Sequence, residues 1–87
     1  MKIQLRYFAS LRESLGSGEL LDLGDQPRAA VTVGAVRDQL IARGEPHAGA
    51  LARGRALRAA LNQTLCAESS PVGEGDELAF FPPVTGG

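Results

Sequence analysis

One amphipathic helix stands out in the sequence, and the remaining apolar segments are short and alternate in the manner of strands. Thr32 is a good N-cap for this helix, Val31 and Val36 occupy the positions of a hydrophobic staple, and Gly44 ends it. Its apolar stripe would consist of Val33, Val36, Leu40 and Ile41. Its outward-facing residues would be Arg37, Asp38 and Arg43. Because one helix covers one face of one sheet, this pattern predicts a two-layer α+β fold with a mixed sheet packed against one main helix.

Five strand-like segments accompany the helix. In the first, Ile3, Leu5 and Tyr7 alternate with polar residues, which is the period of a half-buried strand. The predicted strands are residues 1–7, 18–25, 55–62, 64–67 and 77–81. Asn62 and Gln63 would form the tight turn between the third and the fourth strand. A short helix is expected over residues 9–16, and loops are expected over residues 25–30 and 71–76. Residues 47–54 are expected to form a loop or a weak turn of helix.

Length and composition exclude several classes of protein. The chain has 87 residues and a net charge of −1, so we expect one small domain over residues 1–81 that binds neither nucleic acid nor membrane. The single cysteine, Cys66, excludes an intramolecular disulfide framework and a Cys-rich zinc or iron–sulfur site. The N-terminal segment has no long apolar run, so neither a signal peptide nor a membrane span is expected. The free thiol favours a cytoplasmic protein.

Other residues that could carry chemistry have simpler structural interpretations. His47 has no acidic or cysteine partner at ligand spacing, which favours a solvated loop residue over a catalytic or metal-binding one. Cys66 has no neighbouring base to activate its thiol, so it is expected to be a packing residue. An acidic turn, expected to be solvated, consists of Glu74, Asp76 and Glu77. A cluster that is either a solvated face or a docking surface for an acidic partner consists of Arg53, Arg55 and Arg58.

The last predicted strand and the residues after it carry a stronger signal. Adjacent strand residues point to opposite faces, so Phe80 would join the core and Phe81 would lie on the other face as an interface anchor, unless another part of the chain covers it. Pro82 and Pro83 must end the strand pairing because proline has no N–H to donate. Residues 82–87 would then form an extended tail that spans about 20 Å, at roughly 3.3 Å per residue.

The tail ends in two glycines, Gly86 and Gly87. Residues without a Cβ can pass through a channel too narrow for other side chains, and the chain ends in an unhindered carboxylate. A carboxylate is inert until it is activated, but its adenylate is an acyl electrophile that sulfur or nitrogen can attack. The glycine pairs at 16–18 and 73–75 do not form a phosphate-binding loop, so another protein would have to bind the ATP.

Several motifs resemble the small subunit of molybdopterin synthase, the sulfur carrier family of molybdenum cofactor biosynthesis. They are KIQLRYFASLRE (2–13), LNQTL (61–65), GEGDE (73–77) and AFFPPVTGG (79–87). The resemblance covers the whole chain, is most specific at its end, and implies the ubiquitin-like β-grasp fold. The segment 47–55 has no signature of that family.

The resemblance implies a sulfur carrier that is itself a non-catalytic subunit and binds no cofactor. An activating enzyme, an ATP-dependent adenylyltransferase, would adenylylate Gly87, which is then converted to a thiocarboxylate. Val84, Thr85 and Gly86 would thread into the active site of the large subunit, in a heterotetramer built on a central dimer of large subunits. The sulfur would pass to cyclic pyranopterin monophosphate to form the dithiolene of molybdopterin. Residues expected at the partner interface are Phe81, Pro82 and Pro83.

Three alternatives stay open at this point. The carrier could deliver sulfur to another acceptor, for thiamine, thiolated tRNA or cysteine synthesis. It could instead be a ubiquitin-like protein modifier that joins Gly87 to lysines, although Lys2 is its only lysine. The chain could also be an interaction module whose tail has no chemical role.

Overall fold

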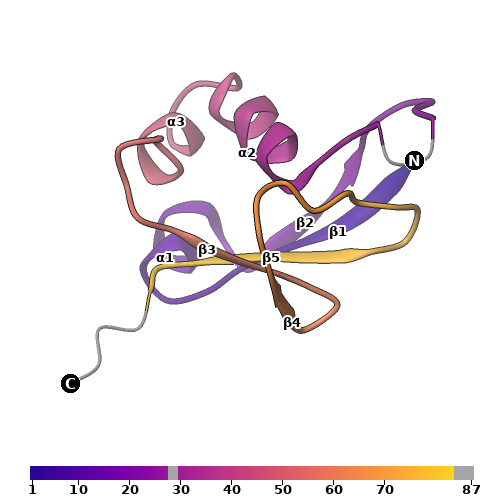
Figure 1. Ribbon diagram of the computed structural model, residues 1–87. Coiled ribbons are helices and arrows are strands. Elements are labelled where there is room, and N and C mark those ends of the chain that lie inside the picture. The colour runs from indigo at the N-terminus through magenta and orange to yellow at the C-terminus, as the bar shows by residue number, and fades with distance from the viewer. Residues whose placement is uncertain (28–29, 84–87) are drawn as a thin grey trace.

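The computed structural model describes residues 1–27 and 30–83, and within them it contains five strands and three helices. The strands are β1 (Lys2–Tyr7), β2 (Gly18–Asp22), β3 (Arg58–Leu61), β4 (Thr64–Cys66) and β5 (Glu77–Phe81). The helices are α1 (Ser10–Leu15), α2 (Val33–Ile41) and α3 (His47–Ala50). The sheet order is β2-β1-β5-β3-β4, with β1 and β5 parallel and all other neighbours antiparallel (Figure 1). This mixed sheet, with α2 as its main helix, confirms the predicted fold class.

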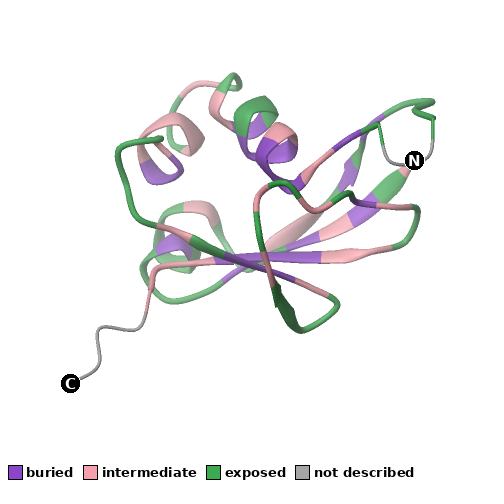
Figure 2. Ribbon diagram, in the orientation of Figure 1, coloured by how far each residue is buried: buried purple, intermediate pink, exposed green. Residues whose placement is uncertain are grey.

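The core lies between α2 and one face of the sheet, where the buried segments of both gather (Figure 2). Ile3, Leu5 and Tyr7 are each at most 1% exposed, which confirms the alternation predicted for the first strand. The largest fully buried side chains are Tyr7, Phe80, Ile3, Leu5, Leu11, Leu40, Leu51, Leu78, Val33 and Val36. The opposite face of the sheet, which we call the open face, is turned away from α2 and α3 (Figure 1).

The start of α2 follows the sequence prediction. The Thr32 hydroxyl accepts a hydrogen bond from the Ala35 N–H at 3.1 Å, as an N-cap does. Val31 and Val36 are both buried, as the staple requires. The N–H groups of Val33 and Gly34 donate to carbonyls of the 68–70 turn, at 2.9 and 2.8 Å. The N-terminus of α2 is therefore held both by its N-cap, Thr32, and by the 68–70 turn.

The prediction that Arg37 faces outward from α2 is wrong, because its side chain is buried and only 3% of the residue is exposed. Its Nε donates to the Leu51 carbonyl at 2.8 Å, and its Nη2 donates to the carbonyls of Ala52 at 2.6 Å and Arg55 at 3.1 Å. Its Nη1 donates to Glu68 Oε2 at 2.7 Å. Backbone carbonyls and one carboxylate replace the water that a buried guanidinium loses. Sequence patterning does not reveal such carbonyls, because every residue type carries one.

Of the two forms expected for residues 47–54, a loop or a weak turn of helix, the structure has the helical turn, which is the short helix α3. Leu51, which is fully buried, and Ala50 anchor this turn to the core. His47 is not a solvated loop residue, since only 17% of its side chain is exposed and its Nε2 lies 3.6 Å from Glu19 Oε2. The small residues of this segment give no helical periodicity, so its packing was not visible in the sequence.

The turn between β3 and β4 is confirmed. Asn62 and Gln63 have φ angles of 49° and 71°, and two positive φ angles are characteristic of a type I′ hairpin turn. Asn62 also joins the hairpin to β5, because its Oδ1 accepts from the Glu77 N–H at 3.0 Å and its Nδ2 donates to Asp76 Oδ1 at 3.1 Å.

Candidate functional site

The strand β5 places two neighbouring phenylalanines on opposite faces of the sheet, as predicted. Phe80 is 1% exposed and belongs to the core, whereas Phe81 is partly exposed and lies directly opposite Arg58 of β3. β5 ends at Phe81, and Pro82 and Pro83 follow it outside any strand. The end of β5 therefore combines a partly exposed aromatic ring with a segment that cannot continue the sheet.

A shallow groove of about 570 Å³ lies on the open face beside this strand end. Ala60 and Ala79, which are partners in the pairing of β3 with β5, lie in the groove, and their small side chains leave room for it. Phe8, Phe81 and Pro82 also line it. An apolar hollow bordered by aromatic side chains is the kind of surface that binds a protein partner.

Phe8 is a groove residue that sequence patterns had not indicated. It is 45% exposed, and its N–H donates to the Phe80 carbonyl at 3.3 Å. Because Tyr7 points into the core, its neighbour Phe8 must point to the other side, and this parity is the signal that could have found it. The Arg6–Glu77 ion pair, 3.2 Å between Nε and Oε1, contributes charged groups to the groove.

The predicted site residues fall into two groups. Phe81 and Pro82 come together at the groove, and Pro83 follows them in the chain. The other four predicted residues lie outside the described part of the chain; they are Val84, Thr85, Gly86 and Gly87. The chemistry assigned to the terminal glycine therefore stays a prediction.

Cys66 and His47 do not line the groove. Cys66 lies opposite Ala59 in the pairing of β3 with β4 and packs against the core. Burial raises the pKa of the Cys66 thiol, which reduces the fraction of reactive thiolate. His47 lies on α3, beside the Glu19 carboxylate. Neither residue combines accessibility with an activating partner, so the groove is the stronger candidate.

The acidic residues around the start of β5 take part in local hydrogen bonds and one ion pair. Asp76 Oδ2 accepts from the Gly73 N–H at 2.8 Å, and Glu74 Oε2 accepts from the Lys2 N–H at 3.2 Å. Glu77 takes part in the ion pair with Arg6. Their roles in the turn explain why three acids stand together here without a two-carboxylate active site.

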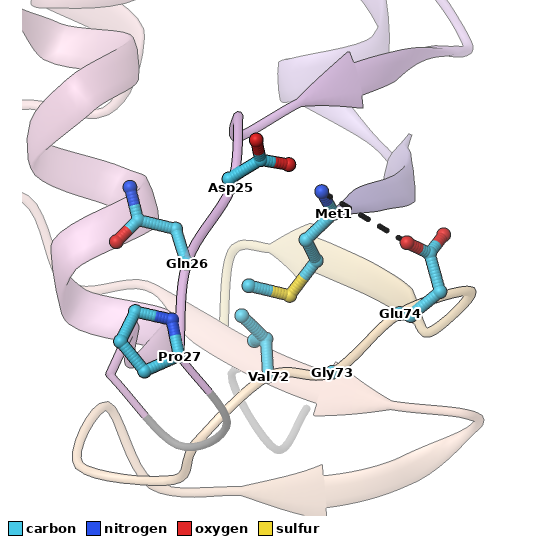
Figure 3. A pocket seen from close by; sticks show the side chains of 7 residues that line it. All are labelled: Met1, Asp25, Gln26, Pro27, Val72, Gly73 and Glu74. Carbon is cyan, nitrogen blue, oxygen red and sulfur yellow. Dashed lines mark ion pairs between the residues drawn. The ribbon is translucent and has the colours of Figure 1, made fainter.

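A second hollow, of about 620 Å³, lies around Met1, at the end of β1 opposite to the groove (Figure 3). The Met1 ammonium donates to the Gly24 carbonyl at 2.6 Å and lies 3.9 Å from Glu74 Oε1. Pro27 and Val72 contribute apolar walls, whereas Asp25 and Glu74 are exposed. This hollow is formed where the first residue attaches to two neighbouring turns.

Within residues 1–27 and 30–83, no three His, Cys, Asp or Glu side chains are grouped so that they could hold a metal ion. None of the helices in that part of the chain has the length and apolar character needed to cross a membrane.

Comparison with known proteins connects this geometry to a family. The sequence pattern of the ThiS family matches residues 5–87. The chain is 44% identical to the molybdopterin synthase sulfur carrier subunit of Escherichia coli (strain K12), over 98% of this chain and 99% of that protein.

Two solved structures have a similar fold. The crystal structure of SAMP1 from Haloferax volcanii, a small archaeal modifier protein, matches with a TM-score of 0.72 and 28% identity over all of both chains. A complex of subunits 1 and 2 of the molybdopterin-converting factor from Helicobacter pylori contains a chain with a TM-score of 0.65 and 23% identity, again over all of both chains.

Proposed function

Because the chain belongs to the ThiS family, we propose that it carries sulfur on its C-terminal residue, Gly87, for the synthesis of molybdopterin. The observation that supports this most strongly is 44% identity to a molybdopterin synthase sulfur carrier subunit over 98% of the chain. The chain has the ubiquitin-like β-grasp fold, in which one main helix packs on a mixed five-stranded sheet. Most of this small fold serves to present one face and one chain end.

The proposed chemistry takes place on a main-chain carboxylate. An activating enzyme transfers AMP from ATP to the carboxylate of Gly87 and releases pyrophosphate. A sulfur donor then attacks the acyl carbon and displaces AMP, which leaves a thiocarboxylate. The large subunit receives Val84, Thr85, Gly86 and Gly87 in its active site, and the sulfur passes to cyclic pyranopterin monophosphate. The carrier itself binds no cofactor in this scheme.

The described residues support the docking step. The groove beside Phe81 offers a partner an apolar surface at the point where the chain leaves the sheet. Pro82 and Pro83 have no N–H to donate, so neither of them can continue the strand pairing of β5. Docking on the groove would thus bring the chain end to the partner's active site.

A reconstituted synthase assay tests the proposal. It contains the carrier, the large subunit, the activating enzyme, ATP, a sulfur donor and cyclic pyranopterin monophosphate. Deletion of Gly86 and Gly87 should abolish molybdopterin formation and leave the circular dichroism spectrum unchanged. Cys66→Ser is the matched control and should retain activity, because the sulfur resides on the terminal carbonyl carbon. Full activity of the truncated chain would refute the proposal.

Phe81→Ala tests the docking surface. It should weaken binding to the large subunit by more than about 1 kcal/mol, as the loss of an interface anchor does. Leu20→Ala is the control, since Leu20 is 63% exposed but lies on β2, at the edge of the sheet. Calorimetry that gives equal affinities for both variants would contradict the role of Phe81.

The similarity to SAMP1 favours one second candidate, a protein modifier that joins its terminal glycine to lysines. Intact mass analysis of the protein and its adducts from cells separates the two. Isopeptide-linked adducts through Gly87 would support the modifier. A terminal oxygen-to-sulfur replacement without such adducts would support the carrier alone.

A further inference from the structure

The arginines of the described chain divide into two groups. Four have a carboxylate of the same chain within 4.0 Å; they are Arg6, Arg37, Arg43 and Arg53. Arg53, which the sequence grouped with Arg55 and Arg58, pairs with both Asp38 and Glu68 and is therefore neutralised within the domain. Among residues 1–27 and 30–83, the arginines without such a pair are Arg12, Arg55 and Arg58. Arg12 lies on α1, whereas Arg55 and Arg58 lie just before and at the start of β3.

The two remaining arginines lie next to the strand end that carries Phe81. Arg58 is the direct partner of Phe81 in the pairing of β3 with β5, so both side chains project from the open face. Arg55 precedes it by three residues, in the segment that leads into β3, and both arginines are exposed. Two unpaired cations therefore stand beside the point where Pro82 leaves the sheet.

The backbone that carries Arg55 is held in place from inside the domain. The Arg55 carbonyl accepts from Arg37 Nη2 at 3.1 Å, and its N–H donates to the Ala52 carbonyl at 2.9 Å. A fixed backbone lowers the entropy that is lost when a side chain engages a partner. Arg37 thus contributes to the surface indirectly, by ordering the segment before β3.

An acidic side chain that lies close to Arg58 is already paired within the domain. Glu68 lines a hollow of about 230 Å³ together with Arg58. Its Oε2 accepts from Arg37 at 2.7 Å, and its Oε1 accepts from Arg53. The pairing with these arginines lowers the pKa of Glu68, so it remains an anion committed to them. It does not neutralise Arg58.

We propose that Arg55 and Arg58 form a basic rim beside the groove, and that this rim binds carboxylates on the surface of the large subunit. The inference rests on the proposed function, because the large subunit is the partner that receives the chain end. Guanidinium groups bind carboxylates through two parallel hydrogen bonds, and charges at the rim of an apolar interface accelerate association. A net charge of −1 and a rim of two arginines do not favour a polyanion such as nucleic acid.

Association kinetics with the purified large subunit test the rim. The double variant R55E/R58E should associate about tenfold more slowly than wild type at low salt, with a much smaller change in the dissociation rate. The difference should shrink at high salt. R55Q/R58Q should show a smaller effect of the same sign. Lys2→Glu is the control: it makes the same charge change as either single substitution, but at the start of β1, and it should associate like wild type.

The outcomes separate this inference from the function it rests on. If wild type fails to bind the large subunit, the proposed function fails. If wild type binds but the double variant associates equally fast at low salt, the basic rim is refuted while the function stands. Thermal melts confirm that each variant is folded.

Discussion

Replacement of the buried Arg37 by methionine tests the least expected feature of the fold. Methionine keeps much of the apolar stem but donates no hydrogen bonds, so the carbonyls of Leu51, Ala52 and Arg55 lose their donor. At about 1 kcal/mol for each lost bond, the expected loss of unfolding free energy is about 3 kcal/mol. Glu68 adds little, because 39% of its side chain is exposed and Arg53 still pairs with it. About 3 kcal/mol is a large share of the stability of a small domain.

Urea unfolding followed by circular dichroism measures this loss. The slope of free energy against urea should stay unchanged, so that the shift in midpoint reports stability alone. Arg53→Met is the matched control: its side chain is 46% exposed, and surface ion pairs contribute about 0–1 kcal/mol. If Arg37→Met costs no more than Arg53→Met, the buried guanidinium does not hold the 51–55 segment as described.

Three further predictions concern titration and backbone strain. Burial raises the pKa of Tyr7 to about 12. Because Tyr7 is the only tyrosine and tryptophan is absent, phenolate absorbance should rise near that pH in the folded protein but near pH 10 in denaturant. Equal titration midpoints in the two states would contradict the burial of Tyr7. The hydrogen bond from Arg53, followed by that from Arg37, lowers the pKa of Glu68 in the folded protein. The ionised Glu68 therefore stabilises the fold above the pKa of about 4.3 that it has in the unfolded chain, and this stabilisation is lost as the pH falls through its lower pKa in the folded protein. Glu68→Gln should therefore destabilise the protein at neutral pH, and urea unfolding should show a difference from wild type that shrinks in acid; a constant difference would argue against the ion pairs. Gln63 has a φ angle of 71°, so Gln63→Gly should raise the unfolding free energy by about 0.5 kcal/mol, and a lower melting temperature would argue against the type I′ turn.

The parts of the fold that sequence predicted are those set by local geometry. Alternation placed Ile3, Leu5 and Tyr7 in the core, and the same parity separated Phe80 from Phe81. Within one strand or one helix, the position of a residue in the sequence decides the face to which its side chain points. These predictions therefore needed no knowledge of the tertiary structure.

The features that sequence did not reveal depend on distant groups. The groove needs the pairing of β5 with both β1 and β3, which brings Phe8 and Ala60 to one surface. Arg37 is buried because carbonyls 14 to 18 residues away solvate its guanidinium. Arg53 belongs to the arginine cluster that the sequence suggested, but it pairs with Asp38 and Glu68. Arg55 and Arg58 are the members of that cluster that have no such pair. Charge in the sequence shows where cations are, but only the folded chain shows which of them are already paired.

The proposed function requires that the terminal carboxylate carries the sulfur. Intact mass and fragment mass analysis test it most directly, after incubation of the carrier with the activating enzyme, ATP and a sulfur donor. We expect one oxygen-to-sulfur replacement located at Gly87. It should be retained in Cys66→Ser and absent after deletion of Gly86 and Gly87. Sulfur located on Cys66, or an unmodified terminal glycine in a fully active protein, would contradict it.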